Sequence, residues 1–246
     1  MIKIVISFLF ILSSMHATSL KVAVSANVRF AFDEIIQKYH EKNSIKIIPI
    51  IASSGKLTAQ IEHGAPFDLF LSANMKYPNY LYEKKLAISK PKIYAYGTLV
   101  LWGLNTKVEP SLENLKNKNI KKIAIPNPKI APYGVEAIKV LEKHGLKNKL
   151  QSKIVFGDSV SQTNQYIYSR AADIGITAKS VVLSPKMSNI GKYIELDHKD
   201  YSPIKQGVVI LKYGKTNNTK ASQNFYDFLF SNDAKIIFKK YGYLIP

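Results

Sequence analysis

Apolar positions along the chain follow two different spacings. Short apolar runs predict strands, and between them apolar residues spaced three and four apart predict helices; the clearest stripe includes Phe32, Ile35 and Tyr39. The predicted strands cover residues 21–24, 45–50, 68–71, 122–125, 154–156, 173–177 and 193–196. The predicted helices cover residues 28–42, 55–63, 76–84, 132–144, 160–169, 221–230 and 233–241. This alternation predicts an α/β fold with parallel sheets covered by helices.

Two long extended segments, residues 94–105 and 201–214, interrupt the alternation. If both pass between lobes, the chain leaves one lobe near Thr98, builds a second, and returns near Gln206. The predicted organisation is then a discontinuous first lobe, residues 19–98 and 206–246, and a second lobe, residues 99–205, with a cleft between them. A single open sheet with two long strands is the alternative that the pattern leaves open.

The first residues have the layout of a secretory signal. Lys3 precedes an apolar run from Ile4 to Leu12, and small and polar residues follow around Ala17. The run is too short to cross a bilayer. We therefore expect residues 1–18 to be a signal peptide and the mature protein to be periplasmic; a buried first strand or an anchoring helix is the alternative.

Composition excludes several classes of site. The chain has no cysteine, and its five histidines are scattered without the spacing of metal ligands, so we expect no metal bound by side chains and no cofactor. The formal charge of +18 comes mainly from dispersed lysines, because Arg29 and Arg170 are the only arginines. Dispersed lysine is typical of a solvated surface, and specific nucleic-acid recognition relies on arginine. We expect no nucleic-acid partner.

Small and polar residues occupy four junctions between a predicted strand and the helix after it. Ligands of open α/β sheets collect at such junctions, where unpaired N–H groups and the helix dipole favour an anion. Helix capping is the alternative at each junction, and it is the interpretation favoured at Asp158. The four junctions read Ser25-Ala26-Asn27, Ser53-Ser54-Gly55, "PNPKIAPYGVEAI" after residue 125, and "GDSVSQTN" after residue 156.

Enzyme signatures are weak. The chain has neither a GxSxG elbow nor an HExxH motif, and we expect that it is not an enzyme. An exported α/β hydrolase is the alternative from a different class. It would require a base, His63 or His144, hydrogen-bonded to Ser53 or Ser54.

Four segments resemble the periplasmic molybdate-binding proteins of ABC importers over nearly the whole mature chain. They are "LKVAVSANVRFAFDEI", "IASSGKLTAQIEHGAPFDLFLSA", "IPNPKIAPYGVEAIKVL" and "FYDFLFSNDAKIIFKKYGY". The resemblance implies a type II periplasmic binding fold, with two α/β lobes joined by two hinge-crossing strands. It also implies a non-enzymatic monomer that closes on molybdate or tungstate and delivers it to the permease of an ABC transporter. Sulfate or phosphate is the alternative ligand within the same fold.

The resemblance also implies the residues of the oxoanion site, which hold the anion with hydroxyls and backbone N–H groups. The matching positions are Asn27, where the family usually has serine and where an amide can still donate, then Ser54, and the backbone donors of Tyr133 and Val160. Ala26 and Ser53 stand beside them and belong to the expected set.

Two positions depart from the family's pattern. The tyrosine hydroxyl that the family places after the late strand falls at Ala178, so that donor is missing. Ser25, Ser53, Tyr133 or Ser161 are the candidates for a substitute hydroxyl. Arg29, in the first turn after Asn27, either points to solvent or reaches the rim of the cleft and compensates.

Overall fold

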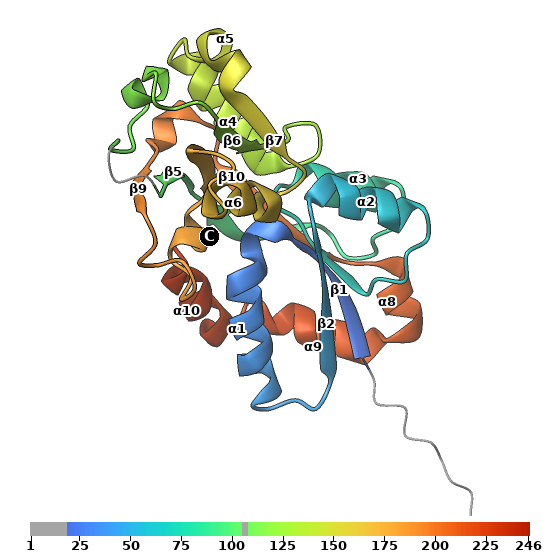
Figure 1. Ribbon diagram of the computed structural model, residues 1–246. Coiled ribbons are helices and arrows are strands. Elements are labelled where there is room, and N and C mark those ends of the chain that lie inside the picture. The colour runs from blue at the N-terminus through green and yellow to red at the C-terminus, as the bar shows by residue number, and fades with distance from the viewer. Residues whose placement is uncertain (1–18, 105–107) are drawn as a thin grey trace, which may run out of the picture.

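The computed structural model describes residues 19–104 and 108–246, so the expected signal peptide at residues 1–18 lies outside the described residues. Two five-stranded sheets form two lobes, which Figure 1 shows one above the other, with β6 and β7 in the upper lobe and β1 and β2 in the lower. Within the described part of the chain, no helix is both long and apolar enough to span a bilayer.

The first sheet has the strand order β2-β1-β3-β10-β4 and is covered on both faces. Strand β1 runs parallel to β2 and β3, whereas β10 runs antiparallel to β3 and β4. Its strands are β1 (Ser19–Ser25), β2 (Lys46–Ala52), β3 (Leu69–Leu71), β4 (Lys92–Gly97) and β10 (Ile204–Ile210). Its helices are η1 (Ala26–Val28), α1 (Arg29–His40), α2 (Ser54–Glu62), α3 (Lys76–Glu83), α8 (Lys212–Asn217), α9 (Thr219–Phe228) and α10 (Asn232–Lys240).

The second sheet has the strand order β7-β6-β8-β5-β9. Strand β6 runs parallel to β7 and β8, whereas β5 runs antiparallel to β8 and β9. Its strands are β5 (Leu99–Gly103), β6 (Ile123–Pro126), β7 (Ile154–Gly157), β8 (Ile174–Ala178) and β9 (Lys192–Glu195). The helices around it are η2 (Glu113–Lys116), α4 (Pro132–Lys143), α5 (Lys147–Leu150), η3 (Gln151–Lys153), α6 (Val160–Tyr168), α7 (Lys179–Val182) and η4 (His198–Asp200).

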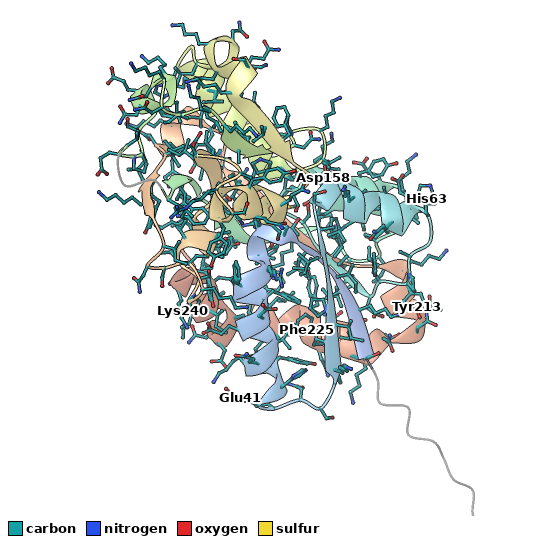
Figure 2. All side chains as sticks on the ribbon, in the orientation of Figure 1. Glu41, His63, Asp158, Tyr213, Phe225 and Lys240 are labelled. Atoms are coloured by element: carbon teal, nitrogen blue, oxygen red, sulfur yellow. The ribbon has the colours of Figure 1, made fainter. Side chains whose placement is uncertain are left out.

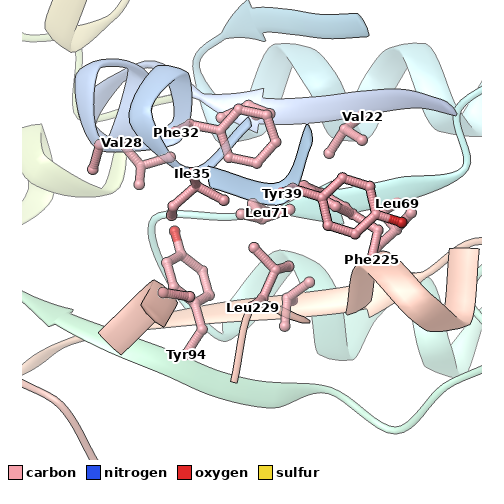
Figure 3. Close-up of a cluster of buried hydrophobic side chains, with 14 of the residues drawn as sticks. Val22, Val28, Phe32, Ile35, Tyr39, Leu69, Leu71, Tyr94, Phe225 and Leu229 are labelled. Carbon is pink, nitrogen blue, oxygen red and sulfur yellow. The ribbon is translucent and has the colours of Figure 1, made fainter. Parts of the chain in front are cut away.

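Alternate residues of each strand supply the cores on the two faces of a sheet. In the first sheet, Val22 and Val24 face the cluster under α1 and α9, while Ala23 between them faces the cluster under α2 and α3. Figure 3 shows the first cluster, where Phe32 of α1 meets Phe225 of α9 edge to face at 5.8 Å between ring centroids. Such double-sided burial explains why the strands read as continuous apolar runs.

Two expectations about the strands are corrected by the structure. The sheets are mixed rather than parallel, because strands β5 and β10 follow the passage between lobes and enter their sheets antiparallel to their neighbours. The segment 201–214 is also not extended throughout: β10 ends at Ile210, and α8 begins at Lys212. The segment 94–105 divides at Thr98 between β4 of one sheet and β5 of the other.

Candidate functional site

The serine hydroxyls of the first lobe meet at the carboxyl ends of its parallel strands. Ser25 ends β1, Ser54 begins α2, and their hydroxyls are hydrogen-bonded to each other. Both hydroxyls accept from the backbone N–H of Ala73, at 3.2 Å and 3.0 Å. Ser53 is the N-cap of α2, but its side chain makes no capping bond and its buried hydroxyl has no partner. Neither Ser53 nor Ser54 caps its own helix, so simple capping does not explain this pair.

The helix starts of the second lobe pack near these serines, because they share one buried group with Ala73. Tyr133 lies in the first turn of α4, and Val160 is the first residue of α6. Both are buried in one group with Ala26 of the first lobe and with Ala178, which ends β8. The structure therefore places Ala26, Tyr133, Val160 and Ala178 in one buried group, in which Ala178 contributes a methyl group at the position where the resemblance implies a tyrosine.

The lobes touch directly beside this cluster. The backbone N–H of Gly55 in the first lobe donates to the Ile130 carbonyl of the second at 2.9 Å, and Lys56 forms an ion pair with Asp158 at 2.6 Å. Figure 2 shows Asp158 beside the N-terminal end of α2, the end that carries Lys56. A Cβ on Gly55 would lie 2.9 Å from the Ile130 oxygen, so only glycine permits this approach.

Asn27 differs from the expectation that its side-chain amide donates to a ligand. Its Nδ2 donates to Gln206 Oε1 at 2.6 Å and to the Tyr243 hydroxyl at 3.1 Å. Two partners match the two hydrogens of the NH₂ group, so the amide is occupied inside the protein. What Asn27 presents at the start of η1 is its main chain.

Arg29 lies at the rim, not in the buried cluster. It is exposed and lines a surface hollow of about 430 Å³ between the start of α1 and helix α6, together with Ser161 and Ser159. Ser161, one candidate for a substitute hydroxyl, therefore faces the rim as well. Of the four candidates, Ser25 is already paired, while Ser53 and Tyr133 keep buried hydroxyls without partners.

The residue expected to cap α6 is corrected by the structure. Ser159 is the N-cap and accepts from the Gln162 N–H at 3.2 Å, whereas Asp158 pairs with Lys56. Asp and Ser are both common N-cap residues, so the local sequence could not show which of Asp158 and Ser159 caps α6 and which reaches the other lobe.

No base activates the serines in the described residues. His63 Nδ1 bonds the Ala59 carbonyl near the end of α2 opposite Asp158, as Figure 2 shows, and His144 Nε2 bonds Asp200 at 2.6 Å. Neither histidine reaches Ser53 or Ser54, as a hydrolase would require. Residues 19–104 and 108–246 also hold no cluster of side chains suited to a metal ion.

Charge is distributed so that the cluster contains only neutral donors. Outside residues 1–18 and 105–107, no lysine, arginine or histidine is buried. Burial raises the pKa of the Tyr133 and Tyr94 hydroxyls well above the usual value, and raises the pKa of Tyr243 to about 12. These phenols stay protonated at neutral pH and remain hydrogen-bond donors.

Three residues at this site were not identified from the sequence. Ala73 supplies the N–H shared by the serines, and Gln206 and Tyr243 hold Asn27. Gln206 carried a usable signal, because it is a polar residue within the buried strand β10 and is itself fully buried. Tyr243 lies far from Asn27 in sequence, and no local pattern connects them.

The chain is similar to known proteins over most of its length. The family model described as "Bacterial extracellular solute-binding protein" matches residues 20–244. The molybdate-binding protein ModA of Azotobacter vinelandii is 34% identical over 230 residues, which cover 93% of this chain and 90% of that protein. The ModA protein of Rhodobacter capsulatus is 35% identical over 224 residues, 90% of this chain and 86% of that protein. The solved Azotobacter vinelandii periplasmic molybdate-binding protein superposes with a TM-score of 0.85 at 31% identity, covering 92% of this chain and 99% of the other.

Proposed function

The chain belongs to the bacterial extracellular solute-binding proteins, and from that premise we propose that its solute is a tetrahedral oxoanion, molybdate or tungstate. The anion would bind where the helix starts of the two lobes meet, and the bound form would be delivered to an ABC importer. The chain performs no chemistry on the ion. Its task is to select the anion, enclose it and release it.

One observation supports this proposal: helix starts from both lobes pack together beside buried, neutral hydrogen-bond donors. Ala26, Tyr133 and Val160 share one buried cluster, and the Ser25–Ser54 pair lies at the adjoining strand ends. Helix N-termini supply N–H groups and a partial positive charge without any side-chain cation. A dianion can therefore be held here although no cation is buried in the described chain.

The donors expected to face the anion are main-chain N–H groups and hydroxyls. We assign the former to Asn27, Ser54, Tyr133 and Val160, and the latter to Ser54 and Ser53, whose hydroxyl has no other partner. Hydrogen bonds to a charged group contribute about 1.5 to 3 kcal/mol each. Six such bonds are sufficient for sub-micromolar binding, which requires about 8 kcal/mol after the entropy of association is subtracted.

The cellular setting follows from the same premise. We propose that residues 1–18 direct export, that the mature chain works in the periplasm as a monomer, and that lobe 1 consists of residues 19–98 and 206–246 with lobe 2 between them. The permease of an ABC transporter is the proposed membrane partner. Cell fractionation and size-exclusion chromatography of the mature protein test the first two statements.

Calorimetric titration of the mature protein with molybdate, tungstate, sulfate and phosphate tests the ligand. We expect heat with a metal oxoanion, and a rise in melting temperature of about 5 to 10 °C at a hundredfold excess over Kd. Phosphate carries a proton at neutral pH and needs an acceptor. Asp158 is half-exposed and already paired with Lys56, so we expect phosphate to bind weakly. Absence of heat and of a thermal shift with both metal oxoanions would refute the proposal.

A further inference from the structure

A buried polar chain runs behind the proposed anion site. Gln206 Oε1 accepts from Asn27 Nδ2 at 2.6 Å and from the Tyr94 hydroxyl at 3.1 Å. Two donors on one oxygen settle the orientation of this amide, so its Nε2 must point the other way. The main-chain carbonyl of Asn27 accepts from Tyr243 at 2.9 Å and from Ser180 of the second lobe at 2.7 Å. Asn27 is thus held from both lobes.

Two polar atoms at the end of this chain make no hydrogen bond of good geometry, although the Asn27 amide and the Tyr243 hydroxyl lie beside the Tyr133 hydroxyl. They are Gln206 Nε2 and the Tyr133 hydroxyl, in residues that are 0% and 1% exposed. Buried polar groups in proteins are almost always paired, and an orphaned one is costly. One carries only hydrogens to donate, and the other can accept, so the two are chemically complementary.

Both orphaned atoms lie over Gly97, the last residue of β4 before the chain passes between lobes. A Cβ placed on Gly97 would be 2.1 Å from the Tyr133 hydroxyl oxygen and 3.1 Å from Gln206 Nε2. The absence of a side chain at Gly97 therefore lets both polar atoms approach its backbone closely. Tyr133 reaches this point from α4 of the second lobe, and Gln206 from β10 of the first.

We propose that Tyr133 is a positioning residue for lobe closure. When the lobes come together, its hydroxyl lies against the Gly97 backbone and accepts a hydrogen bond from Gln206 Nε2, directly or through one water. The contact orders Gln206, which in turn fixes Asn27 at the start of η1. Closure and the placement of the Asn27 main chain are then coupled. The expected effect on anion affinity rests on the proposed function. The expected effect on lobe closure does not, because closure can be measured without a ligand.

The first variant is Tyr133→Phe, which removes one oxygen and keeps the ring and the main-chain N–H. We expect molybdate affinity to fall about 2- to 10-fold, the worth of one net hydrogen bond. We also expect small-angle scattering to show a larger share of open molecules, which loss of general stability would not produce. The matched control is Tyr39→Phe, since Tyr39 also has a buried hydroxyl without a partner but lies in the core of the first lobe. It should change neither readout.

The second variant tests the contact between the Tyr133 hydroxyl and the Gly97 backbone. Gly97→Ala should push Tyr133 out, weaken molybdate binding about 5- to 100-fold and open the molecule in scattering without ligand. Tyr133→Leu in the same chain removes the clashing hydroxyl and should restore the compact form. Unchanged scattering for Gly97→Ala, or no restoration in the double variant, would overturn the inference. If the wild-type chain ignores all four anions, the proposed function fails, and the scattering series still decides whether this contact governs closure.

Discussion

The ion pair between Lys56 and Asp158 joins opposite faces of the cleft. Lys56 lies in the first turn of α2, and Asp158 precedes α6, with 2.6 Å between Nζ and Oδ2. When the lobes separate, this contact breaks. Whatever free energy it contributes therefore stabilises the closed form alone and should appear in the rate of ligand release.

The expected magnitude is small, because both side chains are about half exposed, 47% and 56%. Exposed pairs contribute about 0.2 to 1 kcal/mol, which corresponds to roughly a 1.4- to 5-fold change in the release rate. High salt should suppress the effect, since the Debye length falls to about 3 Å at 1 M ionic strength.

The assay is a double-mutant cycle with Lys56→Met, Asp158→Asn and the double variant, read as the molybdate release rate by stopped flow. The cycle is necessary because each single variant also changes the charge beside a dianion, in opposite directions. Only the coupling term isolates the contact. The chain offers a matched control: Lys147 and Glu142 are also 2.6 Å apart and about half exposed, but both lie in the second lobe.

We expect coupling in the release rate for the Lys56–Asp158 cycle at low salt, little coupling at high salt, and none for the Lys147–Glu142 cycle. Equal coupling in the two cycles would mean that the effect reflects general surface charge. No coupling at low salt would mean that the contact does not hold the lobes together, and the reasoning would be wrong.

Three further outcomes are expected. Ser54→Ala should weaken molybdate binding by about 1 to 3 kcal/mol, because its hydroxyl is central to the Ser25–Ala73 contacts; calorimetry tests this, with buried Ser222→Ala as a control outside the cleft. Gly55→Ala should weaken binding by a similar amount through its clash with the Ile130 backbone. Denaturant melts should show little loss of stability, since alanine favours a helix over glycine and the Tyr77 hydroxyl, also 2.9 Å from the added Cβ, is the far end of a side chain that can move. Burial raises the pKa of Tyr243 to about 12, so the folded state keeps this proton more tightly than the unfolded state does. The contribution of Tyr243 to the free energy of unfolding should be fully present below about pH 10 and should be lost as the pH rises towards 12. The fall in this free energy with pH should be smaller in Tyr243→Phe.

The sequence predicted helices and strands well where the pattern of apolar residues within one segment is sufficient to indicate its secondary structure. The stripe of α1 and the apolar runs of β1 and β6 are local signals, and the structure has each close to its expected bounds. The four polar junctions were also recognisable, because a strand followed by small polar residues and a helix is a local motif.

Contacts between distant segments were not predictable in the same way. The partner of Asn27 Nδ2 is Gln206, 179 residues away, and the partner of Asp158 is Lys56, 102 residues away. Asn27 and Asp158 are both residue types with strong local roles, as a donor and as a helix cap, and those roles were the natural expectation. Tertiary geometry gave both side chains other partners. The antiparallel entries of β5 and β10 belong to the same class, since they depend on where the chain crosses between lobes.

Under the proposed function, so basic a chain has to be selective by means other than its surface charge. A formal charge of +18 raises the rate at which small anions reach the protein, and it does so for sulfate, phosphate and molybdate alike. Selection therefore has to occur inside, where no lysine, arginine or histidine of the described chain is buried. A buried unpaired cation would cost several kcal/mol whenever the lobes closed without an anion, and it would attract every anion strongly. Main-chain N–H groups and neutral hydroxyls avoid that cost. Because their positions are fixed by helices and by the Asn27–Gln206 contact, we expect them to distinguish anions by size and shape.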